Sequence, residues 1–288
     1  GVIPLYEIFE TVLMLSIFGF AVISLLLAFK PITSKKLPAR WQYCVWIAVL
    51  ILMIVPVYKL IPQGQAQKIS AVSALPKAVE PKIPPTETVE NTPGDTNTPA
   101  EHKEPYFTPN VPIRLSAVTS YIWFGGVCVF LIFVAASYTA YISKMKKNSA
   151  EISENEIFEN AKRELGIKRK VKIRVSANTD SPLLVGVFFP TVYIPCRKIP
   201  EERLKMVFLH ELTHYMRKDL LVKWISVFIN AVHWFNPLVY LLCANLSEAC
   251  EVSCDMAVTK NMTEEERTLY MKTILLLAEH NEKGENHA

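Results

Sequence analysis

Three long apolar segments constrain the fold of this chain more than any other feature. Thr11–Phe29 and Leu115–Ile142 contain no charged residue, and Tyr43–Ile61 contains only Lys59. At about 1.5 Å per residue in a helix, each is long enough to cross a hydrocarbon core about 30 Å thick. Apolar residues make up 51% of the chain, a high share for a soluble protein. The sequence therefore predicts three membrane-spanning helices, with buried core helices as the weaker alternative.

The basic residues beside these segments predict how the chain is oriented in a membrane. The connection between the first two segments holds four basic residues and no acid, and three lysines follow the third segment. Because short cytoplasmic loops are enriched in Lys and Arg, we expect an extracytoplasmic N-terminus and a cytoplasmic C-terminal region. The first segment is too long for a signal-peptide core and no small-residue cleavage site follows it, so we expect a retained anchor.

These segments divide the chain into four parts. Residues 1–61 hold two spans with a basic cytoplasmic loop, 62–114 an extracytoplasmic loop, 115–143 a third span, and 144–288 a cytoplasmic domain. Pro62–Pro112 is rich in Pro and Thr and poor in large apolar residues, so we expect it to be disordered. The six cysteines all lie outside this loop, which argues against a disulfide framework.

The sequence HELTH at residues 210–214 predicts a catalytic zinc site in the cytoplasmic domain. Positions four apart lie on one face of a helix, so the imidazoles of His210 and His214 can bind one Zn²⁺. Glu211 then lies beside the open position, where a water must lose a proton. Helix signals surround the motif, with Pro200 suited to a first turn and apolar residues at spacings of three and four. A surface helix with incidental polar residues is the alternative.

A catalytic zinc needs a third protein ligand. Glu248, Glu251 and Asp255 are spaced i, i+3 and i+7, so these carboxylates share one stripe of a predicted helix. Apolar neighbours favour a buried stripe over a solvated acidic face. We predict Glu251 as the ligand and Asp255 as a carboxylate that orients a ligand histidine, with Glu248 as the weaker alternative. Cys250 and Cys254 could instead complete the site, but a closed site would leave no catalytic position.

Residues 150–200 are predicted to form a small α/β unit. We expect a helix over Ile152–Leu165 and strands over Lys170–Val175, Leu183–Phe189 and Thr191–Ile194. Prolines around the last two runs restrict at least one of them to a sheet edge. An edge strand beside a zinc site could hold a peptide substrate by main-chain pairing, although an ordinary packed hairpin fits the sequence equally well.

The apolar stretch Leu220–Leu246 is similar to a fourth span, but a single crossing would carry Glu251 away from the two histidines. Asn236 followed by Pro237 supplies a helix cap and then a residue suited to a first turn. We therefore expect a membrane-associated helical hairpin over residues 220–246 that returns Glu251 to the metal. His233 is more typical of a structural histidine than of one that binds a transition-state oxygen.

Four stretches of the chain together resemble the BlaR/MecR-type antirepressor metallopeptidases, which are bacterial integral-membrane gluzincins. The stretches are HELTH, Arg217-Lys218-Asp219-Leu220, His233-Trp234-Phe235-Asn236-Pro237 and Glu251-Val252-Ser253-Cys254-Asp255. The layout is similar over the whole chain, and most so over residues 180–260. The resemblance implies a plasma-membrane location, zinc ligands at His210, His214 and Glu251, and Glu211 as general base. In the β-lactam-sensing members of the family, which act in antibiotic resistance, the activated zinc domain leads to cleavage of a DNA-binding repressor, and a self-cleavage step occurs in the zinc-domain region.

The chain departs from those sensors toward its C-terminus. The sensors continue through another span into a large extracellular penicillin-binding-type domain. This chain ends soon after a predicted amphipathic helix, Glu264–Glu279, and shows no Ser-x-x-Lys acylation motif in an extracellular domain. It also begins with Gly1 and not Met, as a fragment would. Antibiotic sensing therefore comes from the resemblance alone.

The predicted fold is an α-helical integral membrane protein with a cytoplasmic α+β zincin-like metallopeptidase domain. The predicted function is that of a zinc endopeptidase of signal transduction, which cleaves a cytoplasmic repressor and also itself. The alternatives are a constitutive quality-control peptidase and a non-catalytic receptor stabilised by zinc, and Glu211 disfavours the latter because a structural site needs no base. The expected partners are the bilayer, the protein substrate and a second copy of the chain, without direct binding of nucleic acid.

Overall fold

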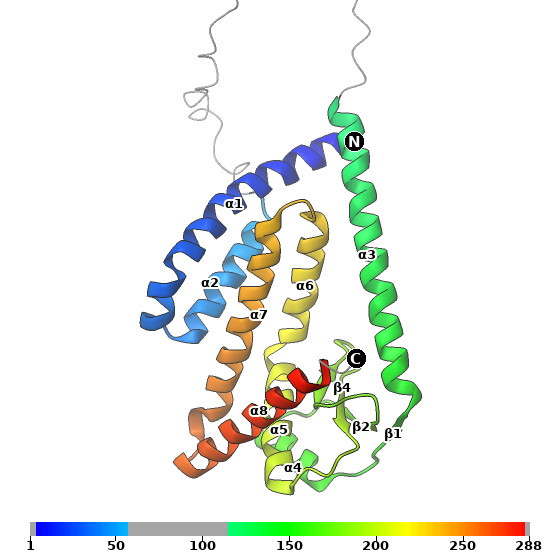
Figure 1. Ribbon diagram of the computed structural model, residues 1–288, viewed down its shortest axis with the longest axis vertical. Coiled ribbons are helices and arrows are strands. Elements are labelled where there is room, and N and C mark those ends of the chain that lie inside the picture. The colour runs from blue at the N-terminus through cyan, green and yellow to red at the C-terminus, as the bar shows by residue number, and fades with distance from the viewer. Residues whose placement is uncertain (1–3, 57–114, 286–288) are drawn as a thin grey trace, which may run out of the picture.

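The computed structural model describes residues 4–56 and 115–285, which form an elongated molecule (Figure 1). In chain order the elements are α1 (Leu5–Lys36), α2 (Ala39–Leu52), α3 (Leu115–Lys147), β1 (Ser149–Glu151), α4 (Glu156–Glu164), β2 (Lys172–Ser176), β3 (Leu183–Val185), β4 (Thr191–Pro195), α5 (Glu201–Arg217), α6 (Asp219–Val232), α7 (Pro237–Val258), the 3₁₀ turn η4 (Thr259–Asn261) and α8 (Glu264–Glu285). Helices α1, α2, α3, α6 and α7 occupy one half, and the sheet with α4, α5 and α8 occupies the other.

Helices α1 and α3 match the first and third predicted spans. Both are long and apolar enough to cross a membrane, over Leu5–Ser34 and Ala117–Lys147. Large apolar side chains along them are exposed, among them Phe18, Ile132 and Phe133. Extended apolar surface of this kind is typical of a protein that contacts lipid.

The second predicted span is shorter than the sequence indicated. Helix α2 has 14 residues, which gives about 21 Å at about 1.5 Å per residue. Pro56 accounts for the early end, because in a continued helix its ring would clash with the carbonyl of Leu52. The prediction of one continuous helix over Tyr43–Ile61 is therefore wrong. Residues 57–61 and the predicted outer loop lie outside the described part of the chain.

Helices α6 and α7 form a hairpin whose turn lies at the predicted position. The Asn236 side chain caps α7 by accepting a hydrogen bond of 3.0 Å from the backbone N–H of Leu238, and Pro237 is the first residue of the helix. The same side chain donates to the backbone carbonyl and the hydroxyl of Ser16 on α1, at 3.2 and 2.8 Å. The hairpin tip is therefore anchored to the first helix of the bundle.

One buried cluster joins α2 to the hairpin. Its main side chains are Tyr43, Trp46 and Leu50 of α2, Ile229 of α6, and Leu242 and Leu246 of α7. Full burial of a large apolar side chain contributes about 1.5–3 kcal/mol. The packing of α2 against α7 thus helps to fix α7, which carries Glu251 toward the half of the molecule that contains the sheet.

His233 lies at the hairpin tip, at the end of α6 opposite to Asp219. It is 1% exposed, and its Nε2 is 3.3 Å from the backbone carbonyl oxygen of Met53. The 14 residues of α6 separate it from the region of His210 and His214. The structural interpretation of His233 is confirmed, and the alternative in which it binds a transition-state oxygen is wrong.

The sheet has the strand order β1-β2-β4-β3, so β1 and β3 are its edges. Strands β2 and β4 are parallel, and each edge strand is antiparallel to its neighbour. The predicted edge position of a proline-flanked run is confirmed by β3. This strand ends at Val185 and not at Phe189, because Gly186 adopts a φ of 88° and begins a turn. The edge of β3 contacts α5, which carries the HELTH motif.

We predict that Asn236→Ala destabilises the protein more than Asn155→Ala. Asn155 also caps a helix, α4, through one hydrogen bond from Phe158. Loss of a cap costs about 1 kcal/mol, and Asn236→Ala also removes two buried hydrogen bonds to Ser16, at about 1 kcal/mol each. Thermal unfolding in detergent should show a larger fall in Tm for Asn236→Ala. Equal falls would contradict the anchoring role of Asn236.

Candidate metal centre

Helix α5 carries the two motif histidines, and its residues explain why it forms. Glu201 and Glu202 lie in the first turn, where negative charge complements the helix dipole. Buried Phe208 and Leu212 belong to the core that α5 shares with the sheet, α4 and α8. Phe208 contacts Phe158 of α4 edge to face, with ring centroids 5.0 Å apart. This packing fixes α5 as a rigid support for the histidines.

The C-cap of helix α5 is Lys218, whose backbone is in the left-handed conformation, and the chain reversal there places Asp219 next to His214. Lys218 has a φ of 61°, and the chain reverses there so that Asp219 begins α6. Asp219 Oδ2 lies 2.8 Å from His214 Nδ1. The buried carboxylate also contacts Arg217 Nε at 3.1 Å and accepts a hydrogen bond of 3.0 Å from the Tyr43 hydroxyl. Asp219 therefore orients the His214 ring and connects it to α2.

Three side-chain atoms from α5 and α7 converge. His210 Nε2 and His214 Nε2 are 3.2 Å apart. Glu251 Oε2 lies 3.1 Å from His214 Nε2 and 3.7 Å from His210 Nε2. Around a tetrahedral zinc with bonds of about 2.0–2.1 Å, neighbouring ligand atoms are about 3.3–3.4 Å apart. The observed spacing is close to this value, so these residues could hold one metal ion.

The outer nitrogens of both imidazoles face hydrogen-bond acceptors. His210 Nδ1 is 2.8 Å from the Tyr270 hydroxyl oxygen and 3.2 Å from Asp255 Oδ1. The Tyr270 hydroxyl donates its proton to the same Asp255 oxygen at 2.6 Å, so the His210 Nδ1 must be the donor toward Tyr270. His214 Nδ1 likewise donates to Asp219. The Nε2 atom of each histidine then points its lone pair toward the Glu251 carboxylate. The two lone pairs and the carboxylate repel one another unless a positive charge lies among them.

Protons can supply this positive charge when a metal does not. Burial lowers the pKa of His210, but hydrogen bonds with Asp255 and Glu251 outweigh burial and raise it to about 9. For His214, burial again acts downward, and the hydrogen bond with Asp219 raises the pKa well above its usual range. A metal ion must therefore displace protons from the imidazoles as it binds.

Two cysteines lie beside the same histidines and are the alternative candidates for a metal ligand. Cys254 forms one group of suitable ligands with His210 and His214. Cys250 forms a second group with His214 and Asp219. Burial raises the pKa of the Cys254 thiol, which disfavours the thiolate form that binds metals. Asp219 is already engaged by the outer nitrogen of His214 and by an arginine. These observations favour Glu251 over the cysteines as a candidate for the third donor.

Glu248, the weaker alternative ligand, is engaged elsewhere. Its Oε2 lies 2.7 Å from the Nζ atom of Lys30 on α1, and its side chain is 64% exposed. The structure thus directs Glu248 toward α1 and brings Glu251 to the histidines.

Glu211 lies next to the edge strand β3. Burial raises the pKa of Glu211, and the two neighbouring imidazoles partly offset this rise. The backbone of Leu184 also acts to lower the pKa of the Glu211 carboxyl. A cavity of about 340 Å³ runs along β3 between α3 and α6, with Tyr138 and Trp224 among its lining residues. The rings of these two residues meet edge to face with centroids 4.9 Å apart.

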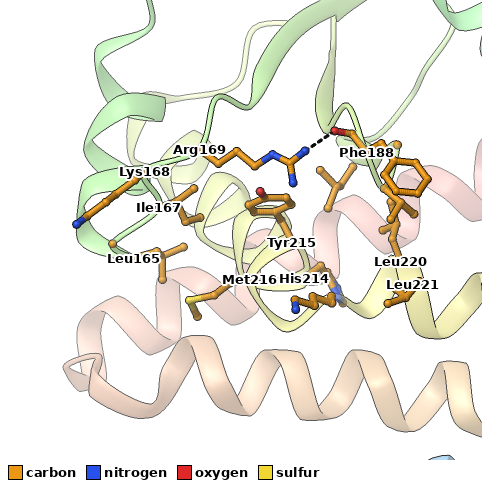
Figure 2. A pocket seen from close by; sticks show the side chains of 15 residues that line it. Leu165, Ile167, Lys168, Arg169, Phe188, His214, Tyr215, Met216, Leu220 and Leu221 are labelled. Atoms are coloured by element: carbon orange, nitrogen blue, oxygen red, sulfur yellow. Dashed lines mark hydrogen bonds between the residues drawn. The ribbon is translucent and has the colours of Figure 1, made fainter.

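A larger cavity of about 500 Å³ adjoins the end of α5 (Figure 2). His214 and Tyr215 line it from α5, Arg169 lines it from the loop before β2, and Phe188 lines it from the loop after β3. In Figure 2 the Arg169 side chain reaches the Phe188 carbonyl oxygen, to which it donates at 2.7 Å. Since Leu184 lines both cavities, β3 borders two spaces that could receive substrate side chains.

Sequence analysis did not identify Asp219 or Tyr270 as site residues. Asp219 had a detectable signal, because it lies five residues after His214 and directly follows the basic end of the helix. Tyr270 lies 60 residues from His210 and has no motif or spacing that links it to α5. Its position depends on how α8 packs against α5.

Comparisons with known proteins show which family this chain belongs to. A family profile described as BlaR1 peptidase M56 matches residues 10–288. The chain is 33% identical to the regulatory protein BlaR1 of Bacillus licheniformis over 159 residues, which are 54% of this chain and 26% of that protein. It is 29% identical over 113 residues to the methicillin resistance mecR1 protein of Staphylococcus aureus strain Mu50, covering 38% of this chain and 19% of the relative.

The regulatory protein BlaR1 of Staphylococcus aureus is 25% identical over 170 residues, covering 55% of this chain and 28% of that protein. The aligned regions thus span 19–28% of the length of these relatives. Because the profile match covers nearly the whole chain, the resemblance to BlaR/MecR-type proteins is confirmed. The chain belongs to the BlaR1 peptidase M56 family, and its His210 and His214 fit the metal site of a metallopeptidase.

Proposed function

We propose that this chain is a membrane-embedded zinc endopeptidase of signal transduction that cleaves a cytoplasmic regulator. The convergence of His210 Nε2, His214 Nε2 and Glu251 Oε2, at 3.1–3.7 Å from one another, carries the proposal. Three protein donors are the number found in catalytic zinc sites, where the fourth position serves water or substrate. Membership of a peptidase family supports the same reaction class.

The residues around the site fit peptide hydrolysis. A bound zinc ion would polarise the scissile carbonyl and make a water molecule more acidic. Glu211 would take a proton from that water onto a carboxylate oxygen and pass it to the nitrogen of the leaving amine. Its raised pKa suits it to hold the proton between these steps. Water thus adds across the C–N bond, with the hydroxyl on the carbonyl carbon and the proton on the amine.

The edge of β3 is the proposed binding site for the substrate backbone. It pairs with β4 on one side, and the residues of β3, together with Gly186 of the following turn, line the cavity between α3 and α6 on the other. An extended peptide could add to this edge by main-chain hydrogen bonds. The contact between Leu184 and Glu211 would then bring the peptide close to the general base.

The positions of the basic residues support a cytoplasmic active site. Lys30, near the end of α1, contacts Glu248, which lies one helical turn from Glu251. Three lysines in the last turn of α3 lead directly into β1. The basic ends of α1 and α3 thus lie toward the metal centre, and the positive-inside rule assigns this side to the cytoplasm of a bacterial cell.

A regulatory substrate is favoured over general quality control. The relatives are named as regulatory and methicillin resistance proteins. A DNA-binding repressor is therefore the substrate class that we propose, with self-cleavage as a second reaction of the same site.

We predict that Glu211→Gln abolishes proteolysis and retains zinc. The substitution removes the proton acceptor and leaves all three proposed ligands in place. His214→Ala should lose both zinc and proteolysis, whereas Glu202→Gln, an exposed change on the same helix, should change neither. Metal analysis and cleavage of a candidate repressor by the purified full chain check this. An unchanged cleavage rate in Glu211→Gln would eliminate it as the base.

Tyr270→Phe should weaken zinc binding about tenfold or more, because it removes the hydroxyl that accepts from His210 Nδ1 and donates to Asp255. Tyr215→Phe is the control, since Tyr215 lies on α5 and its ring faces the cavity in Figure 2. Competition with a metal chelator measures both affinities. Equal affinities in the two variants would show that Tyr270 does not support the metal site.

A further inference from the structure

Lys223 of α6 contacts the oxygen of Glu251 that faces away from the histidines. Its Nζ atom lies 3.0 Å from Glu251 Oε1. The other oxygen, Oε2, lies 3.1 Å from His214 Nε2 and 3.7 Å from His210 Nε2. The two oxygens of the Glu251 carboxylate therefore contact different partners, Lys223 for Oε1 and the histidines for Oε2.

Lys223 lies on α6 and lines a cavity next to the candidate metal centre. After Asp219, helix α6 has Ser226 and Asn230 as its uncharged polar residues, and Lys223 is its only basic residue. The side chains of Lys223 and Glu251 are 47% and 44% exposed, so their contact is partly open to solvent. The cavity runs along β3, and Leu184 and Trp224 also line it. Its charge thus lies between the proposed third ligand and the proposed path of the substrate.

We propose that Lys223 is a positioning residue that restricts Glu251 to binding the metal through one oxygen. The inference rests on the zinc site proposed above. Carboxylates can bind metals through one oxygen or two, and a second oxygen would occupy a position that water or substrate needs. By holding Oε1 at 3.0 Å, Lys223 keeps that position free.

Cobalt substitution tests this inference without relying on activity. The visible absorption of Co²⁺ is intense in four-coordinate sites and weaker when the coordination number rises. The full chain in detergent would be loaded with Co²⁺ as wild type, Lys223→Met, Lys223→Arg and Lys30→Met. Lys30→Met is the matched control, because it breaks a lysine–carboxylate contact of 2.7 Å on the same helix, α7, at Glu248.

We expect Lys223→Met to bind one equivalent of Co²⁺ with clearly weaker visible absorption than wild type. Lys223→Arg and Lys30→Met should retain the wild-type spectrum, because an arginine can still hold Oε1 and Glu248 does not bind the metal. Lys223→Leu gives a second uncharged variant if methionine impairs folding, since leucine already occurs in this helix at Leu220 and Leu221.

An unchanged spectrum in both uncharged variants, or the same change in Lys30→Met, would overturn the role of Lys223 and leave the metal site intact. Wild-type protein that binds no Co²⁺ would overturn the metal site and the role of Lys223 together. The two failures are therefore distinguishable in one set of measurements.

Discussion

The meeting of two imidazole nitrogens with one carboxylate oxygen is the constraint on which this structure depends. The histidines come from α5, but Glu251 comes from α7, 37 residues after His214. Between them the chain must leave the site along α6 and return along α7. The hydrogen bonds from His214 to Asp219 and from His210 to Tyr270 fix the outward nitrogens. With these Nδ1 atoms fixed, the lone pairs of the two Nε2 atoms point to a common position.

The helical bundle is joined to this centre through direct contacts. Tyr43 of α2 donates to Asp219, which in turn accepts from His214. Helix α2 also packs along α7, so it contacts both the element that carries Glu251 and the acid that orients a histidine. A shift of α2 would therefore move residues that contact the metal centre. Such a link suits a peptidase whose activity is controlled from the membrane.

Local patterns in the sequence predicted the features that depend on neighbouring residues. The helix at α5 and the cap at Asn236 follow from spacing and from the chemistry of a few adjacent side chains. The helical hairpin over residues 220–246 is also predicted, because a single membrane crossing there would separate Glu251 from the two histidines. The early end of α2 could have been read from Pro56, but the apolar run beyond it masked the signal. The contact of Tyr270 with His210 depends on the packing of α8, and local periodicity carries no information on it.

X-ray absorption at the zinc edge of the metal-loaded full chain tests the central claim most directly. The structure predicts two imidazole nitrogens and one carboxylate oxygen at about 2.0–2.2 Å, with no sulfur in the first coordination shell. A sulfur scatterer at about 2.3 Å would show that Cys254 or Cys250 binds the metal in place of Glu251. That result would contradict the proposed catalytic site.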